Sequence, residues 1–286
     1  MARPKPTKRL ALLTFLPLLS GCAGSVLHDL SDSVTVAVVD QNDVGVVRDG
    51  LPAYLLMTDG LIEKNPDDTG LLTSGAKLYA FFATDLVTDN ARSRKLTDKA
   101  RSYAQRALCL KQDTLCDIDA MTYDDFTRAL QQIDRDDLNE LYTYGLAWTA
   151  WLKAHSRNWS ALADRPKIEA LFERTLELDE SFDFGRAHYY LGLLSSQLSP
   201  ALGGKPEIGK AHFERAIKLS HGQDLAVKVA LAKYYARMVY DRKLHDRLLH
   251  EVLAANTRFP GLTLSNTMAQ QEAQRLLDES SSYFQE

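Results

Sequence analysis

Apolar residues recur at spacings of three and four along most of this chain, and few stretches alternate strictly between apolar and polar positions. A repeat of three and four places side chains on one face of an α-helix, whereas a half-buried β-strand needs a repeat of two. Residues 33–39 are the exception, because they are rich in valine, which favours strands. Since this stretch is short and close to the N-terminus, we expect an all-α fold.

A short apolar frame recurs along the predicted helices and indicates internal repeats. It begins at Ala104, Phe172 and Phe213, and a weaker version begins at His250, so the spacings are 68, 41 and 37 residues. Tetratricopeptide (TPR) repeats have a unit of about 34 residues, so the first gap holds two units or one unit with a large insertion. We therefore expect TPR-like helical hairpins, about four repeats with insertions, stacked as an α-solenoid.

A glycine lies in the helix before each of the three clear frames: Gly75, Gly145 and Gly192. Glycine costs a helix about 1 kcal/mol relative to alanine, so its recurrence at matching positions suggests a packing requirement. A helix that lacks a side chain there lets its partner approach closely, and Phe172 or Phe213 would fill the groove.

Two insertions interrupt the predicted array. Residues 113–137 are rich in aspartate and predict a loop followed by a helix that begins near Thr122. Residues 195–206 contain two glycines and two prolines, which predict a turn of defined geometry rather than a flexible connection.

The N-terminus has the parts of an export signal: a basic start, an apolar run and small residues before a cleavage point. Leu19-Ser20-Gly21-Cys22 resembles the lipobox of bacterial lipoproteins, in which the cysteine is diacylated and becomes the first residue. An ordinary signal in which Cys22 is incidental is the alternative. Ala23 follows the cysteine instead of aspartate, and by resemblance to Gram-negative sorting rules this favours the outer membrane. We expect a periplasmic, lipid-anchored protein.

These features divide the chain into a lipoprotein signal peptide at residues 1–21, an N-terminal tether at 22–50 and a TPR-like repeat domain at 51–286. The signal carries four positive charges and no negative ones, so cleavage moves the net charge from −4 to −8. An acidic body without a basic run argues against nucleic acid or an anionic bilayer surface as a partner, since such binding needs clustered lysine and arginine.

Besides Cys22, the chain has two cysteines, Cys109 and Cys116. On one continuous helix they would lie about 10 Å apart, beyond the reach of a disulfide. They can bond only if the helix stops between them, and residues 112–114 offer such a stop. A disulfide and two buried free thiols are both consistent with the sequence. No histidine is spaced with them as a zinc ligand, so we expect no metal.

Catalytic motifs are absent from the sequence. His245 and His250 lack the spacing of a His-Glu-x-x-His zinc site, and residues 203–205 lack the remaining positions of a phosphate-binding loop. We expect no cofactor and no enzymatic activity. A periplasmic hydrolase is the weakest alternative, which a nucleophile and a base in one cleft would revive.

Two groups of residues are candidates for ligand binding. Tyr144, Trp148 and Trp151 share one predicted helix and would either line an apolar pocket or pack between helices. Arg186, His188 and Tyr189 begin a later helix, where Arg186 would either hold a carboxylate or form a surface ion pair.

Several segments resemble one known family. They are GRAHYYLG at residues 185–192, PALGGKPE at 200–207 and KAHFERA at 210–216, with shorter matches at 227–229, 234–237, 264–270 and 276–277. These segments are similar to the TatT family, the periplasmic TPR lipoproteins associated with TRAP transporters, and the resemblance extends over roughly residues 20 to 284.

The resemblance implies a helical repeat protein that works with the extracytoplasmic solute-binding protein of a TRAP transporter, which delivers ligand to an inner-membrane permease. It also implies ring-like homo-oligomers with a ligand-permissive apolar cavity through the repeat body, but it does not identify the ligand. Our leading hypothesis adds a small apolar or carboxylated ligand within this body. A TPR scaffold lipoprotein in cell-envelope assembly is the alternative, because TPR arrays commonly hold peptides and fold alone does not choose.

Overall fold

The computed structural model describes residues 35–198 and 200–285, and this part of the chain is all-α, without strands. Residues 35–39 are helical, contrary to the strand preference of their valines. Val38 packs against the hydrophobic core, so tertiary contact overrides that local preference. The predicted signal peptide and Cys22 lie outside the described residues. Within the described part, no helix has the length and apolar character needed to cross a membrane.

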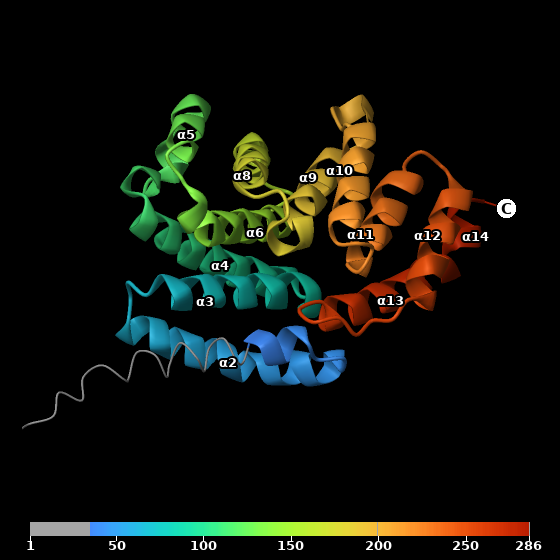
Figure 1. Ribbon diagram of the computed structural model, residues 1–286, viewed down its shortest axis with the longest axis horizontal. Helices are drawn as coiled ribbons and strands as arrows, with labels where there is room; N and C mark the ends of the chain where they lie inside the picture. The colour runs from blue at the N-terminus through green and yellow to red at the C-terminus, as the bar shows by residue number, and fades with distance from the viewer. Residues whose placement is uncertain (1–34, 199, 286) are drawn as a thin grey trace, which may run out of the picture.

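The helices follow one another with short connections (Figure 1). They are α2 (Val44–Lys64), α3 (Thr69–Phe81), α4 (Asn90–Lys111), α5 (Tyr123–Leu130), α6 (Leu138–Ala154), α7 (Trp159–Ala163), α8 (Arg165–Leu178), α9 (Arg186–Ser196), α10 (Pro206–Leu219), α11 (Leu225–Ala230), α12 (Arg242–Ala254), α13 (Thr263–Asp278) and α14 (Ser280–Tyr283). Two π-helices interrupt the series, η1 (Phe82–Leu86) after α3 and η7 (Leu231–Ala236) after α11.

Neighbouring helices pack as pairs: α3 with α4, α6 with α8, and α9 with α10, while η7 packs on α12. Close glycine contacts hold two of these pairs together. A Cβ on Gly145 would lie 2.5 Å from Leu171, and one on Gly192 would lie 2.6 Å from the ring of Phe213. These distances are too short for real carbon atoms. The expected close approach of paired helices at these glycines is therefore confirmed.

The repeated apolar frame is buried in three of its four predicted positions. Ala104, Phe172 and Phe213 are all completely buried. The fourth frame was placed one residue too late, because His250 is exposed and Leu249 is buried in its stead. Packing against α13 and η7 determines which face of α12 is buried. The weak match at His250 therefore did not predict that face.

The C-terminal helices return to the N-terminal helices. In Figure 1 the beginning of α13 lies beside α2 and α3, and α13 contacts α2. The amide of Gly261 donates to the carboxylate of Asp40 at 2.6 Å, and Leu264 joins the hydrophobic cluster of the N-terminal half. Helix α2 begins at Val44 and Val47 is buried, so the predicted boundary between residues 50 and 51 falls inside a packed helix.

Both insertions have defined local structure. Thr122 is the N-cap of α5, at the predicted helix start, and its hydroxyl accepts from the amide of Asp125. In the second insertion residues 200–202 form a 3₁₀ turn, Gly203 adopts φ +85°, and the amide of Lys205 donates to the carbonyl of Ser195 at 2.8 Å. The positive φ explains the glycine at position 203.

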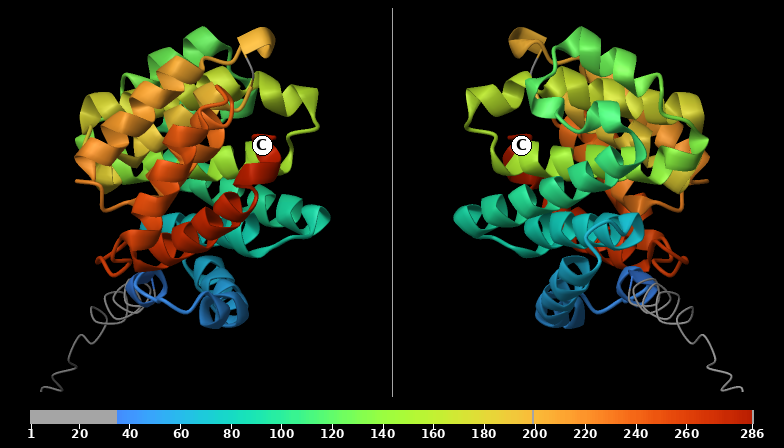
Figure 2. Two further views of the ribbon diagram at one scale, coloured as in Figure 1. Left: turned by 90° about the vertical axis from the view of Figure 1, so that its right-hand side faces the viewer. Right: turned by 90° about the vertical axis from the view of Figure 1, so that its left-hand side faces the viewer.

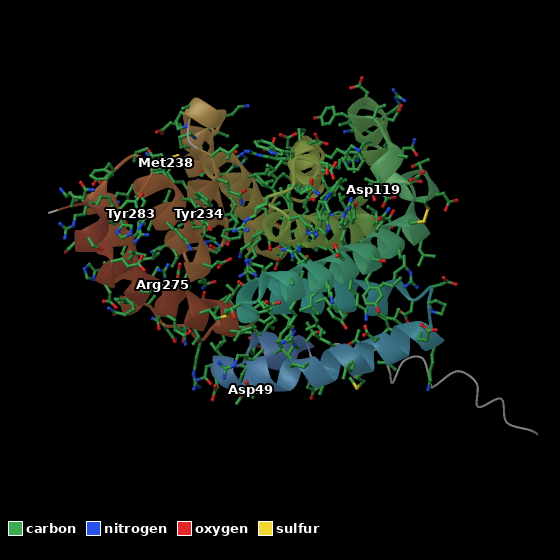
Figure 3. All side chains as sticks on the ribbon, turned by 180° about the vertical axis from the view of Figure 1, so that it is seen from behind. Asp49, Asp119, Tyr234, Met238, Arg275 and Tyr283 are labelled. Carbon is green, nitrogen blue, oxygen red and sulfur yellow. A yellow bond between two sulfur atoms is a disulfide. The ribbon has the colours of Figure 1, made fainter. Side chains whose placement is uncertain are left out.

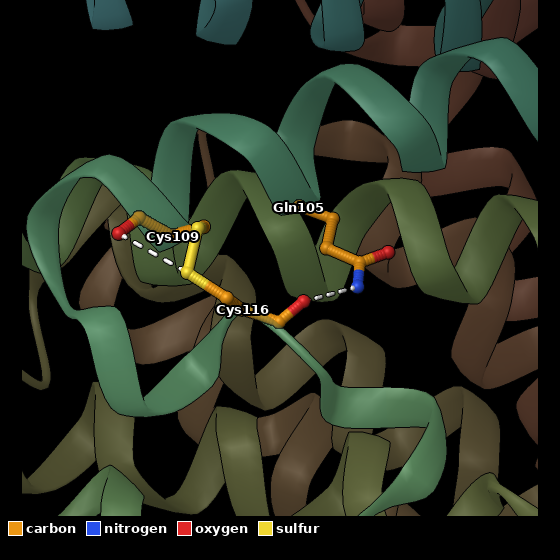
Figure 4. Close-up of a disulfide and its surroundings, with 3 residues drawn as sticks. All are labelled: Gln105, Cys109 and Cys116. Carbon is orange, nitrogen blue, oxygen red and sulfur yellow. Dashed lines mark hydrogen bonds between the residues drawn. A yellow bond between two sulfur atoms is a disulfide. The ribbon is translucent and has the colours of Figure 1, made fainter.

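Helix α4 ends at Lys111 with Gln112 as its C-cap, so the chain turns between the two remaining cysteines. Cys109 and Cys116 form a disulfide, with their Cα atoms 4.5 Å apart (Figure 4). The side-chain amide of Gln105 on α4 donates to the carbonyl of Cys116 at 3.1 Å. Of the two alternatives that the sequence left open, a disulfide or two buried free thiols, the structure contains the disulfide.

Candidate functional site

Three irregular backbone segments converge on the interior between the N-terminal and C-terminal halves. Two are the π-helices η1 and η7, and the third is the turn η5 (Phe182–Gly185) before α9. In that turn Asp183 and Phe184 have φ values of 46° and 60°, which residues other than glycine seldom adopt. Wide helical turns and strained residues occur frequently at functional sites. We call the side chains that they bring together the interior cluster: Asp85, Asp183, Arg186, Tyr189, Tyr190, Asp224 and Tyr234.

Asp85 comes from η1. Its carboxylate accepts from the hydroxyl of Thr84 at 2.6 Å, and the positive charges of Lys153 and Arg186 act on it. Burial nevertheless raises the pKa of Asp85, although its side chain remains exposed to solvent. A carboxyl group surrounded by protein atoms is easier to protonate than one on an open surface.

Arg186 is the cationic centre of the cluster. Its Nε donates to the carboxylate of Asp224 at 2.6 Å, and a terminal nitrogen donates to the hydroxyl of Ser265 on α13 at 3.1 Å. Burial opposes its charge, but the carboxylates of Asp224 and Asp183 outweigh that effect and raise the pKa of Arg186. Arg186 therefore forms an ion pair, as one interpretation expected, but a largely buried one instead of a surface one.

Asp183 and Asp224 frame this arginine. The strained turn places Asp183 where its carboxylate accepts from the buried hydroxyl of Tyr142 at 2.5 Å. Asp224 has a side chain that is 1% exposed, and its second oxygen, Oδ1, has no hydrogen-bond partner in the described part of the chain. Buried polar atoms are nearly always hydrogen-bonded, so this orphan acceptor marks a place for a water molecule or a ligand donor.

Tyrosines supply the remaining wall of the cluster. Tyr189 and Tyr190 lie side by side on α9 with ring centroids 5.2 Å apart, and Tyr190 stacks on Phe172 at 4.9 Å. Burial raises the pKa of both hydroxyls, so they remain neutral hydrogen-bonding groups. Tyr234 on η7 faces Tyr189 from the C-terminal half. Figure 3 shows Tyr234 with Met238 on this part of the chain and Arg275 on the neighbouring α13.

The predicted aromatic group on α6 packs between helices. Tyr144 and Trp148 are completely buried, and Phe126 of α5 meets Trp148 edge to face at 6.1 Å. The guanidinium of Arg101 on α4 lies over Trp148 and Trp151, 4.7 Å from each ring. These contacts fill the space between α4, α5 and α6, so Tyr144, Trp148 and Trp151 belong to the core and lie apart from the interior cluster.

His188 also lies outside the cluster, on another side of α9. Its Nε2 is 3.1 Å from a carboxylate oxygen of Glu180, and its Nδ1 is 2.8 Å from Nδ1 of His212. Glu180 also accepts from Arg215, whose hydrogen bond lowers the pKa of Glu180 to about 2. Of the three residues predicted at the start of α9, Arg186 and Tyr189 therefore share a site, and His188 serves a separate contact between α9 and α10.

Sequence reasoning missed Asp85, Asp183, Tyr190, Asp224 and Tyr234. No local pattern distinguishes the three aspartates from the many others in the chain. Tyr190 and Tyr234 fall inside segments 185–192 and 234–237, which carried the family resemblance, and this was the one available signal. Within the described residues, no group of three or more histidine, cysteine, aspartate or glutamate side chains has the arrangement of a metal site.

Comparison with protein families matches residues 40–284 to the TRAP transporter T-component family, TAtT. No curated protein matches the chain. The match covers nearly all of the described residues, including every member of the interior cluster. The family is a transporter component and is not an enzyme family. The chain belongs to the TRAP transporter T-component family.

Proposed function

We propose that this protein is a lipid-anchored periplasmic accessory of a TRAP-type uptake system, in which TPR-like helical pairs bind the extracytoplasmic solute receptor and enclose a small ligand. The family assignment supports a place in the transporter. The glycine-mediated pairing of α6 with α8 and of α9 with α10 supports a repeat array. The predicted lipobox at Cys22 supports attachment to a membrane surface, the outer membrane being favoured by Ala23.

The interior cluster is the observation that carries the ligand-binding part of this proposal. Two π-helices and a left-handed turn are costly ways to place side chains, and all three direct polar or aromatic groups to one region. Arg186 is already paired with Asp224 and Ser265, so it is a poor free anchor for a ligand carboxylate. Tyrosine faces and hydroxyls, with the carboxyl group of Asp85, favour a small ligand with an apolar body and hydrogen-bonding groups.

The test of receptor binding is a pull-down with the solute receptor encoded beside this protein. The full chain, purified in detergent, should retain that receptor at micromolar concentration. An unrelated periplasmic solute receptor, included at the same concentration, serves as the control. Equal retention of the two receptors, or retention of neither, would contradict the proposed binding of the solute receptor.

The test of ligand binding is native mass spectrometry of the purified protein. A co-purifying ligand should be lost from the Tyr234→Ala variant and retained in Tyr283→Ala, which removes a partly exposed tyrosine of α14 outside the cluster. If the mass of the wild-type protein equals the mass of its polypeptide and lipid alone, and added candidate solutes do not bind, the interior cluster is structural.

A scaffold role in cell-envelope assembly is the second candidate, because a helical array can hold a peptide on its surface. The same pull-down discriminates between the two roles, because retention of outer-membrane assembly proteins in place of the solute receptor would favour the scaffold role. Analytical ultracentrifugation of the full chain tests the ring-like homo-oligomer that the family resemblance implies.

A further inference from the structure

A second site lies outside the interior cluster. A cleft of about 640 Å³ opens between the beginning of α4 and the segment that joins α6 to α8. This joining segment projects from the rest of the molecule (Figure 2). The volume is within the range of about 300 to 1,000 Å³ that is typical of small-molecule sites. The cleft is partly open to solvent and is lined by more polar than apolar groups.

Basic side chains dominate this cleft. Arg94 of α4, Lys153 of α6 and Arg157 of the joining segment line it, together with His155. Among the residues that the structure describes, no aspartate or glutamate is part of the lining. Such a concentration of one sign is unusual in a chain whose net charge is −4, and it focuses a positive potential on the cleft.

Two of these cations are uncommitted. Arg94 and Arg157 form no ion pair within the described part of the chain, and both are exposed. Lys153 donates to the carbonyl of Thr84 at 3.4 Å. Since arginine presents paired donors that match a carboxylate, two unpaired arginines facing one cleft form a suitable anion clamp.

Two carboxylates interact with residues of the lining. Asp98 accepts from Nε1 of Trp151 at 2.8 Å and lies 3.5 Å from Nε2 of His155. The charge of Lys153 acts on Asp85 of the interior cluster. Within the described part of the chain neither carboxylate pairs with Arg94 or Arg157, so the charges of these two arginines are available to a ligand.

Trp159 supplies an aromatic wall. Its side chain is 85% exposed, the highest value among the large apolar side chains of the described residues. An aromatic ring that stands uncovered beside free cations offers apolar contact to the carbon skeleton of a ligand whose charge the cations bind.

We propose that this cleft binds a small organic anion that carries one or two carboxylates, with Arg94 and Arg157 on the carboxylates and Trp159 on the carbon chain. The size of the cleft favours a small molecule over a folded partner, which would need a larger surface. The site goes beyond the proposed receptor complex, because it requires neither the receptor nor the interior cluster. Through Lys153 it adjoins Asp85, so it lies next to the interior.

The experiment uses succinate as the probe and succinamide as its neutral counterpart, at constant ionic strength. Isothermal titration of the full chain should show saturable succinate binding with a Kd of about 1 mM or tighter, and none for succinamide. Succinate should also change the fluorescence of the wild-type protein but not of Trp159→Phe, which places the ligand in this cleft. Absence of saturable binding overturns the proposal.

Matched variants test whether Arg94 and Arg157 supply the positive charges that bind succinate. Arg94→Gln with Arg157→Gln should weaken succinate binding at least about tenfold, since charge-assisted hydrogen bonds are lost. Lys95→Gln is the control, because it removes the same charge from the adjacent position of α4 outside the lining. If Lys95→Gln weakens succinate binding as much as the double variant does, the attraction comes from the general positive potential of this surface and not from a defined site. Binding of polyglutamate without binding of succinate would show an acidic protein segment as occupant, and this also overturns the proposal.

Discussion

The buried ion pair of Arg186 illustrates how much single residues matter in this protein. Asp224 is almost inaccessible, and one of its oxygens already lacks a partner. A buried carboxylate is tolerated because a cation lies 2.6 Å away. Removal of that cation would leave the negative charge without compensation. Arg186 therefore has a structural role within the interior cluster, as the partner of Asp224.

We expect Arg186→Met to lower the free energy of unfolding by about 3 to 5 kcal/mol, because it strands the Asp224 carboxylate. Arg135→Met is the matched control, since Arg135 is 70% exposed and pairs with Asp179 at the surface. That change should cost at most about 1 kcal/mol. Urea unfolding of the two variants measures both values. Similar losses in the two variants would contradict the buried pair.

The histidine pair between α9 and α10 predicts a loss of stability in acid. Glu180 accepts from Nε2 of His188, so Nδ1 of neutral His188 must accept from Nδ1–H of His212. Burial, aided by repulsion from His188, lowers the pKa of His212 to about 4, from about 6.5 in the unfolded chain. The unfolded state therefore binds more protons between these values, and stability falls as the pH drops from about 6.5 to 4.

The loss should reach about 2 to 3 kcal/mol at pH 4 for His212, and the lowered pKa of His188 adds to it. Glu180, with a pKa of about 2, contributes only below about pH 4.5. Melting temperatures between pH 7 and 5 thus isolate the histidines. His212→Asn should flatten the pH dependence of the melting temperature, and exposed His250→Asn should not. An unchanged slope in His212→Asn would disprove this assignment.

At the scale of elements, the helical pairs depend on glycine opposite an aromatic ring. The ring of Phe213 occupies the place where Gly192 would carry a Cβ, and Phe172 has the same relation to Gly145. Other glycines have no such neighbour: a Cβ on Gly60 in α2 would meet nothing within 4 Å. The same residue type thus has opposite effects on stability in two helices of one molecule.

We expect Gly192→Ala to destabilise the protein by about 1 to 3 kcal/mol, because the added methyl group forces α9 and α10 apart. Gly192→Leu should be worse. Gly60→Ala should stabilise by about 0.5 to 1 kcal/mol, because alanine favours the helix and no atom opposes its Cβ. Thermal denaturation of the three variants provides the comparison. A shift of the same sign for both alanine variants would show that the helices do not meet at Gly192.

At the scale of the whole molecule, the chain returns on itself. Contacts of α13 with α2 and of Gly261 with Asp40 join segments more than 200 residues apart in sequence. Near this return Arg186 of α9 donates to Ser265 of α13, and η7 packs against α9. The interior cluster therefore takes its residues from segments between η1 and η7, and α13 supplies a hydrogen-bond partner to its arginine.

The predicted lipobox at residues 19–22, which precedes the described fold, predicts attachment of the protein to a membrane. We expect Cys22→Ser to move the protein from the membrane pellet to the soluble fraction, because diacylation supplies about 0.8 kcal/mol per buried methylene. Fractionation of cells that express the two forms measures this, with Cys109→Ser as a control that should stay in the pellet. Retention of Cys22→Ser in the pellet would show that the cysteine is not the anchor.

Much of the local structure was determined by the sequence alone. The spacing of apolar residues predicted helices. The C-cap of α4 at Gln112 and the N-cap of α5 at Thr122 lie where the sequence has residues that stop or cap a helix. The glycines in α6 and α9 predicted close helical pairs. These features depend on neighbours within one or two turns, so the linear order of residues is sufficient to reveal them.

Only the tertiary structure decided which side chains meet. Trp148 and Trp151 resembled pocket residues but are covered by Arg101, whereas Asp85 and Asp224 had no distinguishing pattern and lie beside Arg186. The burial of Leu249 in place of His250 was decided in the same way. In each case the partner lies on another element, and the packing of these elements sets the contact. Periodicity fixes the face of a helix, and packing of distant segments decides what that face meets.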